Sequence, residues 1–171
     1  MEYDKKLDEY NKNDLIYLDE TGIGKGDIQT SAWMRKGTMR EIRVTGQRTK
    51  RTNIIAAKYR NNIIAPFIFE GSCNSELFIA YIEQILCPEL TLGTVVIMDN
   101  ASFHKSSRIK ELIESNGCTL LYLPRYSPER NPIEKYWSIL KKKVKQIQCT
   151  TSDIYDAISE ALLQTQNFGQ P

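Results

Sequence analysis

Histidine is almost absent from this sequence, with His104 alone among 171 residues. Cysteine is also sparse: the four cysteines lie 14, 31 and 31 positions apart, and no CxxC pair occurs. A structural zinc site needs clustered cysteine and histidine ligands, so the cysteines are interpreted as buried or free thiols. A histidine-dependent catalytic triad would have to use His104, and no GxSxG motif accompanies it.

Long apolar runs are missing as well. No run approaches the roughly 18 residues that span a bilayer. The charged N-terminus, MEYDKKLDEYNKND, lacks the apolar core of a signal peptide. We therefore expect a cytoplasmic protein with no membrane partner. Internal repeats and low-complexity linkers are absent too, and 41% of the residues are hydrophobic, which predicts a single domain over residues 1–171.

Charge is segregated along the chain, although the formal net charge is only +2. Residues 1–20 hold seven acids and three lysines, whereas residues 35–60 hold nine bases and one acid, and residues 103–145 hold ten bases and four acids. Two basic stretches indicate a polyanionic partner, most simply nucleic acid, although solvated charged faces would give the same pattern. The candidate DNA-binding residues are Arg48, Lys50, Arg51, His104, Lys105, Arg125, Tyr126, Lys135, Lys142 and Lys145.

Hydrophobic periodicity predicts the order β-β-β-α-β-α-β-α-α. The predicted strands are Leu15–Glu20, RTNIIAAKYR and NIIAPFIFEG (a hairpin around Asn61-Asn62), Thr94–Asp99 and CTLLYL. The predicted helices are NSELFIAYIEQIL, a segment from about 106 to 116 closed by Gly117, IEKYWSILKKKVK, and a last helix over about 152–166. This order predicts a mixed, five-stranded α/β sheet covered by helices, with its core over about 15–147.

A glycine-rich segment, TGIGKGD, follows the first predicted strand. It lacks the four-residue spacer and the Ser or Thr of a phosphate-binding P-loop, so we predict a turn there. His104 follows Asp99 by five positions and would either orient a water or phosphate near that carboxylate or serve as a packing residue. Tyr126 would either stack on a base or pack against the protein.

Two predicted central strands each end on an aspartate, Asp19 and Asp99. If the strands are neighbours, the two carboxylates lie close together, which is costly unless a cation neutralises them. Hard oxygen ligands suit Mg²⁺ or Mn²⁺. Both aspartates also suit strand-end turns, and Asp99-Asn100 is a good turn dipeptide.

Glu134 has two interpretations. The segment Asn131-Pro132-Ile133-Glu134 has the form of a helix start, with Asn as the N-cap and Glu at the third position, so Glu134 could simply cap the helix. Alternatively, a helix folded over the strand ends would deliver Glu134 as the third ligand of a two-metal site. The apolar stripe beside Glu134 is expected to pack on the sheet and comprises Ile133, Trp137, Leu140, Val144 and Ile147.

Taken together, these motifs resemble the catalytic domain of IS630-family transposases, within the IS630/Tc1/mariner superfamily. The matching pieces, in chain order from about Leu15 to Lys145, are YLDETGI, FEGSCNSELF, VVIMDNASFHK and LPRYSPERNPIEKYWSILKKKVK. The most specific feature is the interval of 34 residues between Asp99 and Glu134, which is similar to the second spacing of that family's D-D-E arrangement.

The resemblance implies an RNase H-like fold in which Asp19, Asp99 and Glu134 are catalytic and bind two Mg²⁺ ions, with Mn²⁺ as a substitute. It implies a DNA-associated enzyme that hydrolyses phosphodiester bonds at transposon ends and then joins the freed 3′-OH to target DNA at TA dinucleotides, as a homodimer. The N-terminal helix-turn-helix domain of such transposases is expected to be absent. The alternatives are an RNase H-like nuclease or resolvase without strand transfer, and an inactive DNA-binding remnant.

Overall fold

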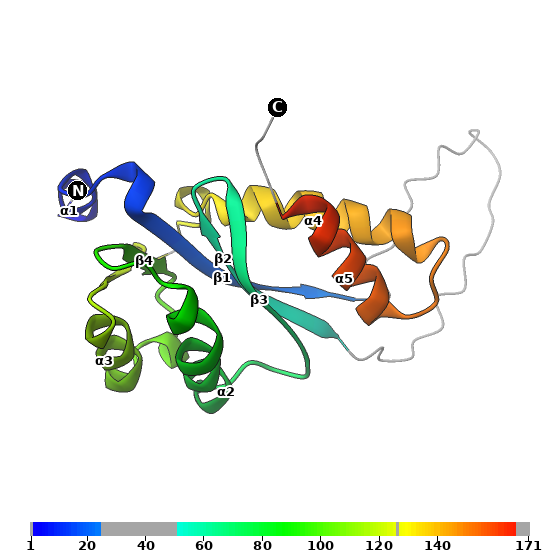
Figure 1. Cartoon of the computed structure of the whole chain (residues 1–171), viewed down its shortest axis with the longest axis horizontal. Helices are drawn as coiled ribbons and strands as arrows, with labels where there is room; N and C mark the ends of the chain where they lie inside the picture. The colour runs from blue at the N-terminus through cyan, green and yellow to red at the C-terminus, as the bar shows by residue number, and fades with distance from the viewer. Residues whose placement is uncertain (1, 25–50, 126, 167–171) are drawn as a thin grey trace, which may run out of the picture.

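The computed structural model describes residues 2–24, 51–125 and 127–166, where five strands form one sheet with helices on both of its faces (Figure 1). The strands are β1 (Leu15–Ile23), β2 (Thr52–Tyr59), β3 (Asn62–Glu70), β4 (Val95–Met98) and β5 (Thr119–Tyr122). The α-helices are α1 (Glu2–Asp8), α2 (Ser75–Tyr81), α3 (Ser107–Ser115), α4 (Ile133–Gln148) and α5 (Ile154–Thr165). Short helical turns are η1 (Lys12–Asp14), η2 (Ile82–Leu86), η3 (Cys87–Glu89), η4 (Ser102–His104) and η5 (Pro128–Arg130).

The sheet has the strand order β3-β2-β1-β4-β5 and is mixed, as predicted. β2 is antiparallel to both β1 and β3, whereas β4 runs parallel to both β1 and β5. Leu15 pairs with Val95 and Tyr17 with Ile97. Continuing that register brings Asp19 level with Asp99 at the edge where the parallel strands end.

Successive side chains of β1 point to opposite faces of the sheet and pack into separate hydrophobic clusters. Ile16 and Leu18 are fully or almost fully buried with residues of α2 and α3. Ile23, on the opposite face, is buried with residues of α4 and α5, and Leu15 packs with Val95, Ile97 and residues of the N-terminal segment. Asp19 therefore faces α4, and Glu20 faces the α2–α3 side.

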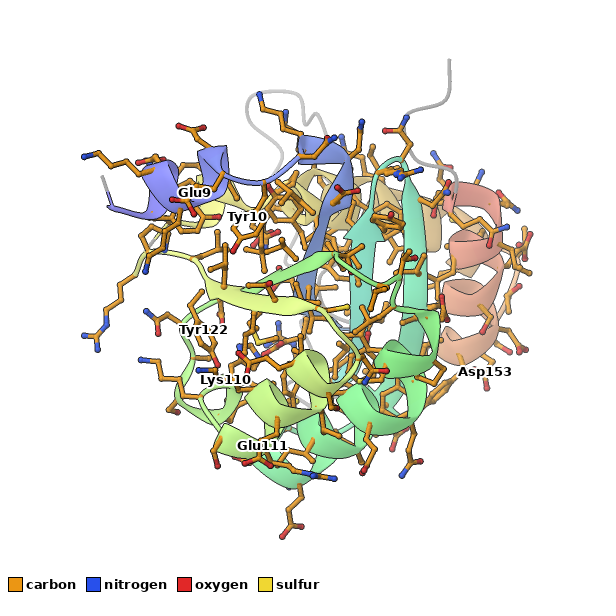
Figure 2. All side chains as sticks on the ribbon, turned by 60° about the vertical axis from the view of Figure 1, so that its left-hand side comes forward. Glu9, Tyr10, Lys110, Glu111, Tyr122 and Asp153 are labelled. Carbon is orange, nitrogen blue, oxygen red and sulfur yellow. The ribbon has the colours of Figure 1, made fainter. Side chains whose placement is uncertain are left out.

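Amphipathic periodicity accounts for the helices that cover the sheet. The predicted apolar stripe of α4 is buried, together with Tyr136. Side-chain caps begin two of these helices: Asn74 Oδ1 accepts the Leu77 N–H at 2.8 Å at the start of α2, and Ser106 Oγ accepts the Arg108 N–H at 3.2 Å at the start of α3. In Figure 2, Lys110 and Glu111 lie on α3, away from Asp153 at the start of α5.

One local prediction was wrong, the predicted hairpin turn is shifted by one position, and one helix was not predicted. β1 continues through Thr21, Gly22 and Ile23, where a turn was predicted, because this stretch pairs with the start of β2 and cross-strand hydrogen bonds outweigh the local preference of glycine. The rest of that glycine-rich segment lies outside the described residues. The hairpin turn is at Arg60-Asn61, one position early, with Arg60 at φ 54°. The helix α1 was not predicted. No helix within the described ranges is long and apolar enough to cross a membrane.

Candidate active site

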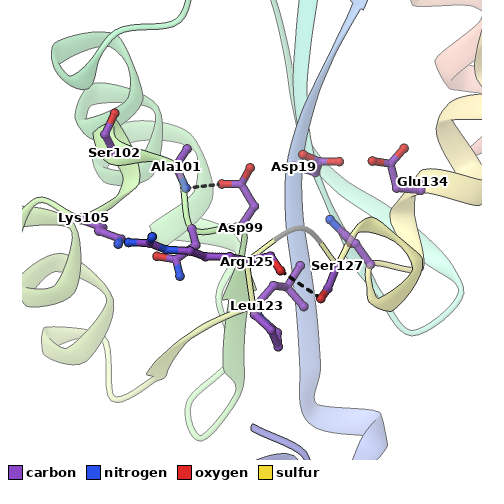
Figure 3. Close-up of a pocket in the computed structure, with 12 residues that line it drawn as sticks. Asp19, Asp99, Ala101, Ser102, Lys105, Leu123, Arg125, Ser127 and Glu134 are labelled. Carbon is purple, nitrogen blue, oxygen red and sulfur yellow. Dashed lines mark hydrogen bonds between the residues drawn. The ribbon is translucent and has the colours of Figure 1, made fainter.

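Three carboxylates from distant parts of the chain line one cavity of about 610 Å³. Asp19 comes from β1, Asp99 directly follows β4, and Glu134 lies in the first turn of α4. Figure 3 shows them in the order Asp99, Asp19 and Glu134 across the cavity. The parallel pairing of β1 with β4 and the packing of α4 on the sheet thus bring together the residues that the sequence singled out.

Asp19 is the most electrostatically perturbed member of the group. Burial, reinforced by the negative charge of Glu134, raises the pKa of Asp19 to about 7. Two hydrogen bonds oppose this shift: the Trp137 indole Nε1–H donates to Asp19 Oδ2 at 3.1 Å, and the Glu20 backbone N–H also donates to the carboxylate. The ionised form of Asp19 is therefore disfavoured in the metal-free protein, and a cation beside it would relieve that cost.

Asp99 is held from the other side by two donors to a single oxygen. Its Oδ1 accepts the Ala101 N–H at 2.9 Å and lies 2.5 Å from His104 Nδ1. The hydrogen bond from His104 lowers the pKa of Asp99. Burial alone would lower the pKa of His104, but its interactions with the carboxylates of Asp99 and Glu20 outweigh burial and raise it to about 9. The pair is therefore an aspartate and a protonated imidazole near neutral pH.

Glu134 does not cap its helix in this structure. The cap comes from Asn131, whose buried side-chain Oδ1 accepts the Ile133 N–H at 3.4 Å, while the Glu134 N–H donates to the Asn131 carbonyl at 3.1 Å. Within the described part of the chain, the exposed Glu134 carboxylate has no hydrogen bond and no ion pair. The capping interpretation thus loses its main support, and Glu134 is free to face the cavity.

The donor set fits a hard divalent cation in its chemistry, since it consists of carboxylates. Over the residues that the structure describes, no group of three His, Cys, Asp or Glu side chains is already gathered at metal-coordinating distances. Asp19 and Glu134 repel each other electrostatically, as carboxylates do without a counter-ion. The three carboxylates therefore offer oxygen ligands around one cavity, but within the described residues they are not arranged as a ready-made coordination shell.

The predicted DNA-binding residues are in several places. Lys105 and Arg125 line the same cavity as the carboxylates, and Arg51 lines a neighbouring one. Lys135, Lys142 and Lys145 are exposed on α4. Arg48, Lys50 and Tyr126 lie outside the described residues. His104, which was also predicted to contact DNA, has a side chain that is only 1% exposed and that contacts Asp99.

Two residues of the site were missed at the sequence level. Trp137 was assigned only to the apolar stripe, and Glu20 was not considered. Sequence spacing could have indicated both residues. Trp137 follows Glu134 by three positions, which places both near one side of a helix. Glu20 follows Asp19 in a strand, which places the two on opposite faces.

Comparisons with known proteins bear on the family and the fold of this chain. A family described as DDE superfamily endonuclease matches residues 14–154. The chain is 25% identical over 151 residues to the "Insertion element IS630 uncharacterized 39 kDa protein" of Shigella sonnei. That match covers 86% of this chain and 44% of the relative, so the chain spans less than half of the relative's length.

Solved structures with a similar fold include integrase and transposase proteins. The catalytic core domain of BIV integrase is 16% identical, with 89% of this chain and 82% of that chain covered and a TM-score of 0.56. Mos1 in its strand transfer complex is 12% identical, with 97% and 59% covered and a TM-score of 0.61. Mos1 in a pre-cleavage transpososome is also 12% identical, with 92% of this chain and 57% of that chain covered and a TM-score of 0.59. The RNase H-like fold is thereby confirmed.

Proposed function

The chain belongs to the DDE superfamily endonuclease family, and we propose that it is the catalytic domain of a transposase that cuts and joins DNA at transposon ends. The observation that supports this most directly is the presence of Asp19, Asp99 and Glu134 around one cavity. Hydrolysis would free a 3′-OH at the transposon end. That hydroxyl would attack a target phosphodiester, with TA as the expected target dinucleotide, in a complex of two copies of the protein; the new phosphodiester bond would form as the bond to the target strand's 3′-oxygen breaks, leaving a 3′-OH on the target.

The three carboxylates would hold two divalent ions, Mg²⁺ or Mn²⁺. When bound, such ions activate the attacking oxygen and stabilise the leaving oxygen of an in-line displacement. The protein's own contribution is orientation. Trp137 fixes one oxygen of Asp19, His104 and Ala101 fix one oxygen of Asp99, and α4 carries Glu134.

Basic residues extend from this site along α4. Lys141, Lys142 and Lys145 follow Glu134 by 7, 8 and 11 positions, which places them near the same side of the helix. At the cavity itself, Lys105 and Arg125 add positive charge (Figure 3). A DNA strand whose phosphates follow α4 would therefore lead to the carboxylates.

Replacing Lys142 and Lys145 together by glutamine is expected to weaken DNA binding by a similar factor for all sequences. Two lost phosphate contacts should reduce the slope of log affinity against log salt by about 2. Fluorescence anisotropy with a labelled duplex at several salt concentrations measures both effects. The charge-matched control is Arg108→Gln with Lys110→Gln on α3, which covers the other face of the sheet; an equal loss in that control would refute the α4 track.

A joining assay tests the proposed function. A labelled duplex with a free 3′-OH is incubated with supercoiled plasmid and Mg²⁺ or Mn²⁺, and the products are separated on denaturing gels. Joined products that require the metal support a transposase. Metal-dependent nicking without joining indicates a nuclease instead, and neither product under any metal condition would favour the inactive remnant.

A further inference from the structure

Glu20 lies on the opposite side of the sheet from the proposed metal site, yet it is connected to that site through His104. Asp19 and Glu20 are neighbours in β1 and point to opposite faces. Glu20 Oε2 lies 3.3 Å from His104 Nε2, and His104 Nδ1 lies 2.5 Å from Asp99 Oδ1. One imidazole thus bridges two carboxylates that come from β1 and from the end of β4.

The imidazole is tightly constrained. Its ring packs between Phe78 and Phe103, with centroid distances of 4.2 and 4.3 Å. The backbone of His104 is also held, since its carbonyl accepts the Tyr122 hydroxyl at 2.9 Å and its N–H donates to the Ala101 carbonyl at 3.1 Å. Packing therefore sets the plane of the ring, and the two ring nitrogens each contact one carboxylate, Nδ1 that of Asp99 and Nε2 that of Glu20.

Among the described residues, Glu20 is the residue whose polar atom lies within ion-pair distance of His104 Nε2. Within the described residues, neither Nε2 nor Glu20 Oε2 has a hydrogen bond of good geometry, although both atoms are buried. Buried polar atoms without partners are costly. The ion pair at 3.3 Å is what offsets that cost for both, so removing Glu20 would leave Nε2 unsatisfied and favour a rotated or displaced ring.

The two oxygens of the Asp99 carboxylate have different surroundings. Oδ1 accepts both the Ala101 N–H and the His104 ring. The carboxylate is half exposed, with 49% of its side chain accessible, and it lines the cavity with Asp19 and Glu134. With Oδ1 held by two donors, Oδ2 is the oxygen left for a ligand in the cavity.

We propose that Glu20 is a positioning residue that acts on Asp99 through His104, holding the imidazole so that Asp99 keeps one oxygen turned toward the cavity. This inference rests on the proposed function, because it assigns Asp99 to the metal site. Removing a residue that orients a metal ligand commonly lowers metal affinity or activity by about 10- to 100-fold.

The test uses Glu20→Met, which keeps the length of the side chain and removes its polar atoms, beside Glu20→Gln. Glutamine can still hydrogen-bond to Nε2, so it should keep much of the imidazole orientation. We expect Glu20→Met to weaken Mn²⁺ binding about tenfold, as measured by calorimetry, and to change kcat more than KM. Glu20→Gln should keep most of the wild-type Mn²⁺ affinity and most of the wild-type kcat. The control is Glu76→Gln, an exposed glutamate at the start of α2.

A spectroscopic readout separates positioning from simple loss of structure. Because His104 is the single histidine, ¹⁵N-histidine labelling gives one imidazole to follow by NMR in metal-free protein. The Nδ1–H signal of a strong hydrogen bond to Asp99 should be present in the wild type and in Glu20→Gln, and broadened or shifted in Glu20→Met. A wild-type imidazole spectrum and unchanged Mn²⁺ affinity in folded Glu20→Met would overturn the inference.

The same experiment distinguishes this failure from failure of the proposed function. Asp99→Asn is measured in parallel for Mn²⁺ binding. If Asp99→Asn loses Mn²⁺ affinity and Glu20→Met does not, only the role of Glu20 is wrong. If Asp99→Asn also binds Mn²⁺ normally, the proposed metal site itself is wrong.

Discussion

Replacing Glu134 by glutamine is expected to reduce Mg²⁺-dependent DNA cleavage by at least about a hundredfold, since metal-ligand charge stabilises the transition state by several kcal/mol. The fold should persist, because the helix start is capped by Asn131 and not by the Glu134 carboxylate. DNA binding should also be nearly unchanged, since the lysines of α4 remain. Plasmid nicking with Mg²⁺ measures the first effect, and thermal unfolding with duplex anisotropy measures the others.

Glu76→Gln is the matched control for Glu134→Gln. Each glutamate is in the first turn of its helix, so each substitution removes the same favourable interaction with the helix dipole. Glu76 does not line the cavity of the carboxylates, and its variant should cleave DNA like the wild type. If Glu134→Gln instead cleaves normally, or if it unfolds while Glu76→Gln does not, Glu134 is a structural residue.

Replacing Asp19 by asparagine is expected to stabilise the metal-free protein at pH 8 while abolishing cleavage. The amide removes the buried charge and its repulsion with Glu134, and its oxygen can still accept the Trp137 indole N–H. A pKa raised from 3.8 to about 7 corresponds to a stability cost on the order of 4 kcal/mol at high pH. Urea unfolding of both proteins in EDTA measures the difference.

The pH dependence of that difference has a definite sign. Between the unfolded pKa near 3.8 and the folded pKa near 7, the native state binds the extra proton, so the stability of the wild type falls as pH rises through this window. The gain from Asp19→Asn should therefore be small at pH 4 and complete above pH 7. Asp8→Asn, at an exposed carboxylate in α1, should show no such gain.

Divalent ions should reverse the order of stability. An ion that binds only the native site stabilises it in proportion to the logarithm of its concentration over Kd. Added Mn²⁺ should therefore raise the unfolding midpoint of the wild type and leave Asp19→Asn almost unchanged. If Asp19→Asn is no more stable than the wild type in EDTA at pH 8, the charge of Asp19 is not penalised in the native state.

Local patterns were sufficient to predict the elements that carry the carboxylates. The apolar runs that end at Asp19 and Asp99 are central strands because both faces of the sheet are covered by helices. The stripe of α4 is buried because its period matches the helix. The caps at Asn74 and Ser106 were also predictable, since side-chain capping depends only on nearby residues.

Features that depend on distant partners could not be predicted in the same way. The strand character of Gly22 comes from pairing with β2, across a long intervening segment. The burial of His104 depends on Phe78 and Glu20, which come from other elements. The contact of Trp137 with Asp19 depends on how α4 crosses the sheet. In each case, the deciding partner is brought near only by the tertiary fold.

The central place of β1 in the sheet bears on how the protein reaches its native state. Its antiparallel neighbour β2 comes next among the described strands, but its parallel neighbour β4 lies far along the chain. The contact between Trp137 and Asp19 joins residues 118 positions apart. Closing a loop of that length costs conformational entropy before the contacts between its ends contribute any stability. Such contacts therefore form late in folding. The carboxylates would thus meet only near the end of folding, so partly folded chains would not carry the assembled carboxylate cavity.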